Sequence, residues 1–430
     1  MQLTFEAVAE AEPGPKWRTL FERHWPGYRA WFLSRGGAGR SSLATSVRQL
    51  RRFMPELVPT YDRLVELAGG DDLAARFLSF YRPPAYLTHC SQAVWSGPGG
   101  PVLVRNYDLD PALAEGVILH TRWHGRRVIA TGECLWGVDD GMNDAGLAVS
   151  LTFGGRRVVG DGFGIPLILR YVLEFCGTTA EALEVLRRVP SHMAYNVTVL
   201  DRRGDFATAL LAPDRPTVVS RKPVATNHQG EVEWPEQARF SRTLERERFL
   251  TERLADPRTS AEGLIGAFLR APLYATDYGN GFGTLYTAVY RPEQGVAEFR
   301  WPGRRWCQSF DRFREGRRSI RYARADGARR VARGQHVGDA GPWAGPTVGA
   351  DGFDAREAMR PVFRTVRDAL NAAGLPLPAG FVDDLLGSNH PGEVPWERLG
   401  HLWAGTGGVW WGTGAATGRR ERGMPDNPAG

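Results

Sequence analysis

Short apolar runs, each ended by turn residues, begin at Cys90 and constrain the fold more than any other feature of the sequence. Examples lie at residues 117–120, 127–130 and 147–151. Runs of this length and spacing predict strands of an antiparallel sheet. Two helical segments follow at 163–176 and 180–189, and helices placed after such strands must lie on one face of the sheet. The pattern therefore predicts an α+β fold.

A second set of strands and helices follows the first. Strands are predicted at 196–200, 206–211, 217–219, 284–290 and 296–300, and helices at 236–254 and 261–269. Thr178 and Glu181 form a capping-box pattern, which marks the start of the helix at 180–189. Helices and strands in this order predict four layers, stacked as α, β, β and α.

The composition suggests four segments along the chain. Residues 1–89 are predicted to be a mostly helical N-terminal segment, and residues 90–303 to be the sheet domain. Arg, Gly and Ala dominate 304–352, which predicts a linker. Residues 353–430 are predicted to be a helical and Trp-rich extension whose tail is disordered.

Length and apolar content favour a protein with a large core. The chain has 430 residues, of which 42% are hydrophobic. No apolar run reaches the roughly 18 residues needed to cross a bilayer. The N-terminus is acidic and lacks the continuous apolar stretch of a signal peptide. We therefore expect a cytoplasmic protein without a membrane partner.

Charge and cysteine content exclude two classes of site. The net charge is +6, but the arginines that carry it are scattered, which argues against a nucleic-acid partner. The four cysteines, Cys90, Cys134, Cys176 and Cys307, lack Cys-x-x-Cys spacing, so we expect no metal site of the zinc-knuckle type. In a cytoplasm these thiols would be reduced.

The stretch 88–108 carries the clearest chemistry. Cys90 precedes a small-residue turn at 96–100, and the β-type run after this turn ends in Arg105 and Asp108. An antiparallel hairpin would bring the thiol close to both charges. A neighbouring guanidinium lowers the pKa of a thiol and favours the nucleophilic thiolate. Cys90 is therefore the candidate nucleophile, and the alternative is that it is a small buried hydrophobic residue.

Six short motifs stand out along the chain, at 90–92, 105–108, 141–147, 195–201, 226–228 and 284–287. In this order they resemble the autoproteolytic acyltransferases related to acyl-coenzyme A:6-aminopenicillanate acyltransferase. Those enzymes belong with the choloylglycine hydrolases among the N-terminal nucleophile hydrolases. The resemblance covers about residues 45–303 and implies the αββα sandwich of that superfamily, whereas residues 304–430 fall outside it.

The resemblance implies that the precursor cuts itself before its nucleophilic cysteine, here at the His89–Cys90 bond. Residues 1–89 would then be a propeptide or small chain, and 90–303 the catalytic domain. The freed α-amine of Cys90, with an ordinary pKa of about 7.7–8.0, would take the thiol proton. A small-molecule acyl amide or thioester would form a Cys90 thioester, which water or an acceptor amine releases. No cofactor is implied, apart from acyl-coenzyme A as a co-substrate.

The resemblance also implies roles for single residues. Arg105 would favour the thiolate of Cys90, and Asp108 would orient the new amine. Asn227 would donate its side-chain N–H to the oxyanion. Weaker matches for substrate or oxyanion contacts are Thr152, Asn196 and Arg242. The resemblance implies no metal ligand.

His89 departs from the family pattern. Relatives that cut themselves often carry Gly before the cysteine, and the missing side chain eases the strained peptide that self-cleavage needs. In this chain, His89 would either hinder the cut or carry a proton during it.

Three alternatives remain open from the sequence. A Cys-His enzyme would use His192 or His228 as its base, but nothing in the sequence places either ring near Cys90. A metal site would use His120 and His124, but no carboxylate or thiol partner is evident. A non-catalytic binding protein would use the same scaffold without being cut.

Overall fold

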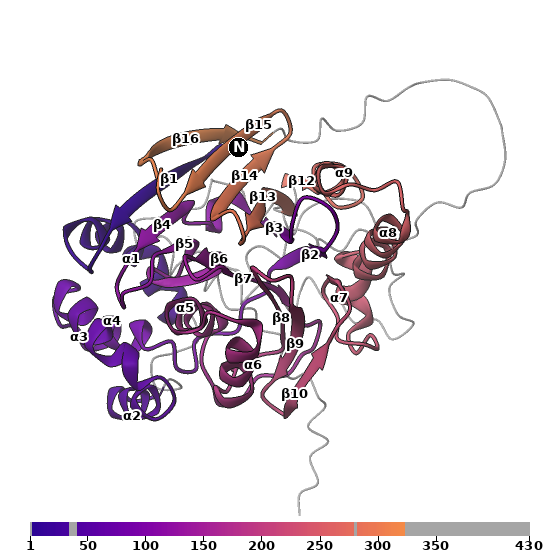
Figure 1. The fold of residues 1–430 in the computed structure, drawn as a ribbon. Helices are drawn as coiled ribbons and strands as arrows, with labels where there is room; N and C mark the ends of the chain where they lie inside the picture. Colours follow the sequence, from indigo (N-terminus) through magenta and orange to yellow (C-terminus); the bar gives the residue numbers. More distant parts are fainter. Residues whose placement is uncertain (1, 34–40, 279–281, 323–430) are drawn as a thin grey trace, which may run out of the picture.

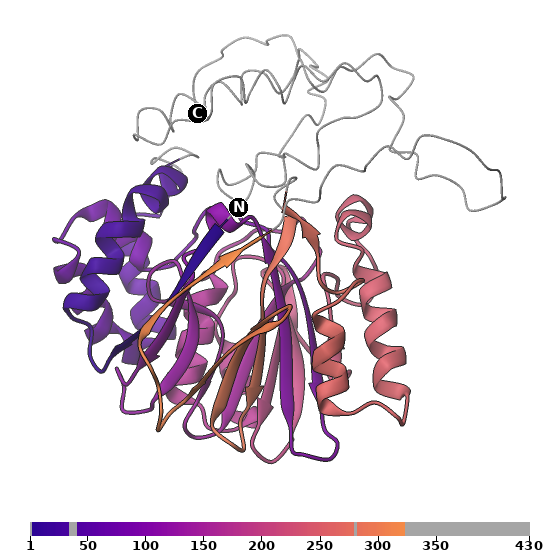
Figure 2. The same ribbon diagram turned by 90° about the horizontal axis from the view of Figure 1, so that it is seen from above.

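Two β-sheets packed face to face form the centre of the protein, and helices cover both outer faces (Figure 1). The computed structural model describes residues 2–33, 41–278 and 282–322. Figure 2 shows the helices of the N-terminal segment and the helices of residues 235–268 on opposite sides of the strands. The predicted α+β fold with αββα layers is confirmed.

The larger sheet has nine strands in the order β10-β9-β8-β7-β6-β5-β4-β1-β16. All neighbours are antiparallel except β1 and β4, which pair in parallel. The strands are β1 (Gln2–Glu10), β4 (Val117–Thr121), β5 (Val128–Glu133), β6 (Gly137–Asn143), β7 (Leu147–Phe153), β8 (Tyr195–Asp201), β9 (Phe206–Ala212), β10 (Arg215–Ser220) and β16 (Gly316–Arg321).

The smaller sheet has the order β11-β2-β3-β13-β14-β15, with β12 paired to β13. Its strands are β2 (His89–Trp95), β3 (Val102–Leu109), β11 (Val224–Ala225), β12 (Thr276–Asp277), β13 (Phe282–Arg291), β14 (Val296–Trp301) and β15 (Arg304–Ser309). The predicted hairpin is β2–β3, in which Cys90 lies opposite Tyr107 and Gln92 opposite Arg105. Since side chains alternate along a strand, all four face the same way, toward the larger sheet.

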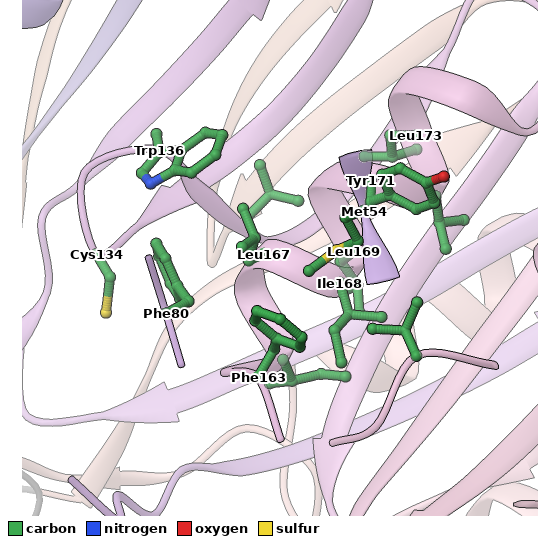
Figure 3. Packing of buried hydrophobic residues seen from close by; sticks show 14 of the residues in the cluster. Met54, Phe80, Cys134, Trp136, Phe163, Leu167, Ile168, Leu169, Tyr171 and Leu173 are labelled. Carbon is green, nitrogen blue, oxygen red and sulfur yellow. The ribbon is translucent and has the colours of Figure 1, made fainter. Parts of the chain in front are cut away.

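Helices α5 (Ile165–Phe175) and α6 (Thr179–Arg188) lie on the outer face of the larger sheet. The apolar sequence of α5 explains why it is almost wholly buried, while the Thr178 hydroxyl caps α6 by accepting a bond from the Glu181 N–H. The N-terminal helices join the same core, where Met54 lies beside Leu169 of α5 (Figure 3). These helices are α1 (Pro15–Leu33), α2 (Leu43–Phe53), α3 (Val58–Leu67) and α4 (Asp72–Leu78).

Helices α7 (Pro235–Phe240), α8 (Thr243–Ala255) and α9 (Ala261–Phe268) cover the smaller sheet. Leu250 of α8 and Phe268 of α9 share a buried cluster with Val104 of β3. The sequence predicts one helix over 236–254. In the structure this helix is interrupted at Arg242, whose φ of 51° lies in the left-handed region. This break sets which face of α8 points toward β2.

A separate apolar layer fills the space between the sheets. Leu103 and Tyr286 enter it from the smaller sheet, and Ile129 and Met142 enter it from the larger one. Cys90 belongs to the same layer. The candidate nucleophile therefore lies in the interior of the sandwich.

The predicted segment boundaries need two corrections. Residues 1–89 are not all helical, because β1 inserts between β4 and β16 and buries Phe5 and Ala7. The predicted linker at 304–352 begins with two strands, β15 and β16, whose buried Trp306 and Ile320 hold them in place. The extension predicted at 353–430 lies outside the described residues. No helix within the described ranges is both long and apolar enough to cross a membrane.

Candidate active site

Cys90 is the second residue of β2, and its side chain is completely buried. Arg105, on the neighbouring strand β3, donates from Nη2 to the Cys90 sulfur at 3.2 Å. The thiol in turn faces the Thr88 hydroxyl, with Sγ and Oγ1 3.8 Å apart. The hairpin thus brings the thiol and the guanidinium together, as its register requires.

Arg105 is held by more than the thiol. Its Nε donates to the Leu151 carbonyl at 2.9 Å, and its guanidinium lies over the Tyr107 ring with its carbon 4.6 Å from the ring centre. Its Nη1 donates to the carboxylate of Asp140 on β6, which is also fully buried. Neither Asp140 nor Tyr107 is among the candidate site residues that the sequence predicts.

The predicted lowering of the Cys90 pKa is wrong for this structure. Burial raises the pKa of the thiol to about 11, and this effect outweighs the stabilising charge of Arg105. Asp108 and Asp139 add to the rise through their negative charge. In the intact chain Cys90 is therefore a neutral thiol at neutral pH.

A second arginine, Arg246 of α8, anchors the backbone around the thiol. It is buried, and its Nη1 donates to the Cys90 carbonyl at 2.7 Å and to the Ser91 hydroxyl at 2.7 Å. The sequence-based candidate, Arg242, is instead exposed and paired with Glu245. Arg246 lies four residues, about one helical turn, after Arg242. Residues four apart lie on the same face of a helix, and this spacing is the sequence signal that points from Arg242 to Arg246.

Asn227 contacts the bond that self-cleavage would break. Its Oδ1 accepts from the Cys90 backbone N–H at 3.2 Å and from Arg246 Nη2 at 2.6 Å. Since both partners are donors, the oxygen of the amide must face Cys90. Its Nδ2 donates to the Phe153 carbonyl at 3.2 Å, so the N–H expected at the oxyanion is engaged elsewhere in this structure.

Thr152 and Asn196 support Asn227 from behind. The Thr152 hydroxyl donates to the Thr226 carbonyl at 2.7 Å, and Asn196 Nδ2 donates to the same carbonyl at 2.8 Å. Asn196 Nδ2 also reaches the His228 carbonyl at 3.0 Å. These two residues therefore hold the 226–228 segment in place, and their bonds go to it rather than to the thiol.

Asp108 presents an unused acceptor beside the same peptide bond. It lies opposite His89 in the hairpin, and its Oδ1 accepts from the Thr284 hydroxyl at 2.7 Å. Its Oδ2 is buried and has no hydrogen-bond partner among the described residues, although Arg246 Nη1 lies 3.6 Å away. Burial raises the pKa of Asp108 to about 6, against the opposing charge of Arg246.

The His89 ring lies on the opposite face of β2 from the thiol, as alternation along a strand requires. It packs between two aromatic rings, Phe240 at 5.1 Å and Phe282 at 4.9 Å between centroids. The side chain at the residue before the cysteine is thus accommodated between α7 and β13.

Comparison with known proteins shows which family this part of the chain is similar to. Residues 95–306 match the family described as acyl-coenzyme A:6-aminopenicillanic acid acyl-transferase. Over this region, which is just under half of its length, the chain is similar to that acyl-transferase family. The resemblance expected from the motifs is thereby confirmed. The match begins five residues after Cys90, so the assignment of the nucleophile rests on the geometry.

Solved structures similar to this chain come from three kinds of amide hydrolase. Penicillin V acylase from Agrobacterium tumefaciens is 16% identical, with a TM-score of 0.37, covering 52% of this chain and 86% of its own. A mutant of conjugated bile acid hydrolase from Clostridium perfringens is 12% identical, with a TM-score of 0.34, covering 56% and 100%. The Caenorhabditis elegans ortholog of N-acylethanolamine-hydrolyzing acid amidase is 17% identical, with a TM-score of 0.36, covering 54% and 100%. No curated protein matches the chain.

The two histidines considered as alternative bases, His192 and His228, have other partners in the structure. His228 Nδ1 bonds to the Thr243 hydroxyl at 2.9 Å, and its Nε2 lies 3.2 Å from the carboxylate of Glu247. His192 Nδ1 bonds to the Phe163 carbonyl at 3.1 Å. The nitrogen that contacts the Cys90 sulfur belongs to Arg105, which argues against a Cys-His pair.

The two histidines considered as an alternative metal site have separate partners in the structure. The His120 ring stacks on Phe313 at 4.8 Å between centroids, while His124 Nε2 bonds to the Thr60 hydroxyl at 3.0 Å. Across the described ranges, no three His, Cys, Asp or Glu side chains are grouped so as to hold a metal ion.

Proposed function

We propose that the chain is a cysteine amidohydrolase or acyltransferase that works through a Cys90 thioester after cutting itself at His89–Cys90. The family of residues 95–306 supports acyl transfer in general. One observation carries the specific proposal: the sulfur of Cys90 is bonded to Arg105, while its backbone N–H is bonded to Asn227. The thiol and the bond to be cut therefore share one polar cluster.

The self-cleavage step balances with the groups at hand. The Cys90 sulfur attacks the His89 carbonyl carbon, so that a C–S bond forms and the peptide C–N bond breaks. The thiol proton goes to the leaving nitrogen, which becomes the α-amine of Cys90. Water then hydrolyses the thioester and leaves a His89 carboxylate and a free Cys90 thiol.

The surrounding residues fit this step. Arg246 holds the Cys90 carbonyl, which keeps β2 in place while the bond on its N-terminal side breaks. Asn227 Oδ1 and the unused Oδ2 of Asp108 are acceptors for the ammonium that appears. Both acceptors exist before the cut, so little rearrangement is needed to receive the new charge.

Catalysis would follow the same chemistry with an external acyl group. The α-amine takes the thiol proton, the thiolate attacks the acyl carbonyl, and the Cys90 thioester passes its acyl group to water or to an amine. Asn227 Nδ2 is the proposed oxyanion donor, once it leaves the Phe153 carbonyl. One such donor is worth roughly 2.7–4 kcal/mol of barrier. Acyl-coenzyme A is the proposed co-substrate where the reaction is acyl transfer, and we place the reaction in the cytoplasm.

Access to the thiol also supports processing. Cys90 is fully buried in the uncut chain, so a substrate reaches it only after residues around it move, and Thr88, just before the proposed cut, lies against the sulfur. Tyr86, in that segment, packs against Trp31 at 6.0 Å and Tyr195 at 6.2 Å between centroids. A cut at His89 gives this segment a free end and lets it move away from the sulfur.

Intact-mass measurement and N-terminal sequencing of the purified protein test the proposal. Self-cleavage gives fragments of 89 and 341 residues, the larger one beginning with Cys90. Cys90→Ala should remain whole, whereas Cys134→Ala, which removes another buried free thiol, should be cut normally.

A panel of acyl amides, and of acyl-coenzyme A with and without an amine acceptor, then tests turnover. Turnover should disappear in Cys90→Ala and persist in Cys134→Ala. An uncut wild-type chain whose Cys90 never reacts with iodoacetamide would instead support a non-catalytic binding protein on the same scaffold.

A further inference from the structure

The Arg105 guanidinium lies between two groups that compete for its charge. Its Nη2 donates to the Cys90 sulfur at 3.2 Å, while its Nη1 pairs with the Asp140 carboxylate. The side chains of Arg105 and Asp140 are both fully buried. The sulfur therefore faces one end of a neutral ion pair rather than an isolated cation.

The Asp140 carboxylate accepts hydrogen bonds from more than one side chain. Besides Arg105, the Tyr286 hydroxyl donates to its Oδ2 at 2.9 Å, and the Tyr290 hydroxyl donates to its Oδ1. Three donors therefore converge on this one buried carboxylate, which is held next to Arg105.

We propose that Asp140 is a positioning residue that confines the charge of Arg105 in an ion pair, so that Cys90 is kept as a neutral thiol with a directed hydrogen-bond donor. This inference rests on the proposed role of Cys90 as the nucleophile. It assigns a purpose to a carboxylate that does not touch the reacting atoms.

A neutral thiol suits the self-cleavage step. The leaving nitrogen of Cys90 needs a proton, and the thiol brings that proton with it. A thiolate would attack the carbonyl faster but would have no proton to give to the amine. A buried neutral thiol is also a poor target for oxidation before processing.

Replacing Asp140 leaves the other charged groups around the Cys90 thiol in place. Asp108 and Asp139 disfavour the Cys90 thiolate, Arg105 favours it, and the charges of Cys90 and Arg246 also interact. Arg105 itself keeps its bond to the Leu151 carbonyl. It also keeps its stacking on Tyr107, so that loss of Asp140 should expose its charge rather than displace it.

The test is a pH titration of Cys90 by NMR in protein labelled with ¹³C at the cysteine Cβ, from about pH 7 to about pH 12, so that the range passes the wild-type midpoint. The Cys90 signal is the one missing from Cys90→Ser, and ionisation of the thiol shifts it without any need for reagent access. Intact mass is recorded for each sample, so that variants are compared in the same cut or uncut state.

Three variants make the titration decisive. Asp140→Asn should lower the Cys90 midpoint by at least about one pH unit, because the charge of Arg105 is no longer balanced. Arg105→Gln should raise the midpoint, which is read as a smaller ionised fraction of Cys90 than in wild type at the highest pH. In the double variant both charges are absent, so the Cys90 midpoint should lie close to that of wild type. The double variant also avoids the unpaired buried charge that destabilises each single variant.

Glu174→Gln is the matched control. Arg170 and Glu174 form another fully buried ion pair, with Nη1 and Oε1 3.0 Å apart, on the far helix α5. Breaking this pair should lower stability but leave the Cys90 titration unchanged.

An Asp140→Asn midpoint equal to wild type, or a double variant shifted as far as Arg105→Gln, would overturn the inference. Either result would leave the proposed function untouched, because fragments and turnover are measured separately. If the wild-type protein is neither cut nor active, the proposed function is refuted, and the titration still tests the role of Asp140.

Discussion

Replacing Asp108 with Asn should make the folded protein more stable at neutral pH while it slows self-cleavage. The pKa of Asp108 rises from 3.8 to about 6, chiefly through burial. Since the folded pKa lies above the unfolded value of about 3.9, the folded state loses stability as the pH rises from about 4 to about 6. The loss is complete above that range.

The size of the effect follows from the shift. Two pKa units at about 1.4 kcal/mol each give about 3 kcal/mol of cost at pH 7. Asn mimics the protonated carboxyl and can keep the bond from Thr284, but its amide places a donor near Arg246. The expected gain is therefore between about 1 and 3 kcal/mol at pH 7, shrinking toward zero near pH 4.

Urea unfolding at a series of pH values measures this difference, with Cys90→Ala as the background so that every chain is whole. Asp214→Asn is the control, because Arg156 lowers the pKa of this exposed carboxylate and its removal should not stabilise the protein at any pH. The reasoning is refuted if Asp108→Asn is less stable than its parent at pH 7. It is equally refuted if the difference does not change with pH.

Three further substitutions separate the site from its surroundings. Arg246→Gln should slow self-cleavage at least about tenfold, since charge-assisted bonds to Cys90 and Asn227 are worth about 1.5–3 kcal/mol each; a normal rate of fragment appearance on gels would contradict this. Arg242→Gln removes an exposed pair with Glu245 and should change the unfolding free energy by less than about 1 kcal/mol, with processing intact. Gly155→Ala should reduce both soluble yield and cleavage, because φ is +70° and the new Cβ would lie 2.3 Å from the Asn227 carbonyl oxygen; wild-type behaviour would argue against a tight fit there.

The hairpin and the central helices could be predicted from the sequence because their signals are local. Alternation along 89–95 and 102–109, joined by a Gly-rich turn, determines which residues face each other. Strand β1 is not predicted from the sequence although its apolar residues alternate, because its partners β4 and β16 come from distant parts of the chain. Local patterns do not report such tertiary pairing.

The site was predictable where it depended on strand register and not where it depended on helix orientation or burial. Arg105 follows from register, but the choice of Arg246 over Arg242 depends on a left-handed turn at the start of α8. Asp140 and Asp139 are adjacent in sequence, and only the packed sheets show which one meets Arg105. The pKa of Cys90 depends on burial, which the sequence does not quantify.

The parallel pairing of β1 with β4 has a practical consequence for making the enzyme. A gene that starts at Cys90 would produce the proposed mature chain without the strand that separates β4 from β16. Both of these strands would then expose unpaired edges, which promote aggregation. The two proposed fragments are therefore partners from synthesis, and the smaller one should co-purify with the larger one after the cut rather than be lost as a discarded leader.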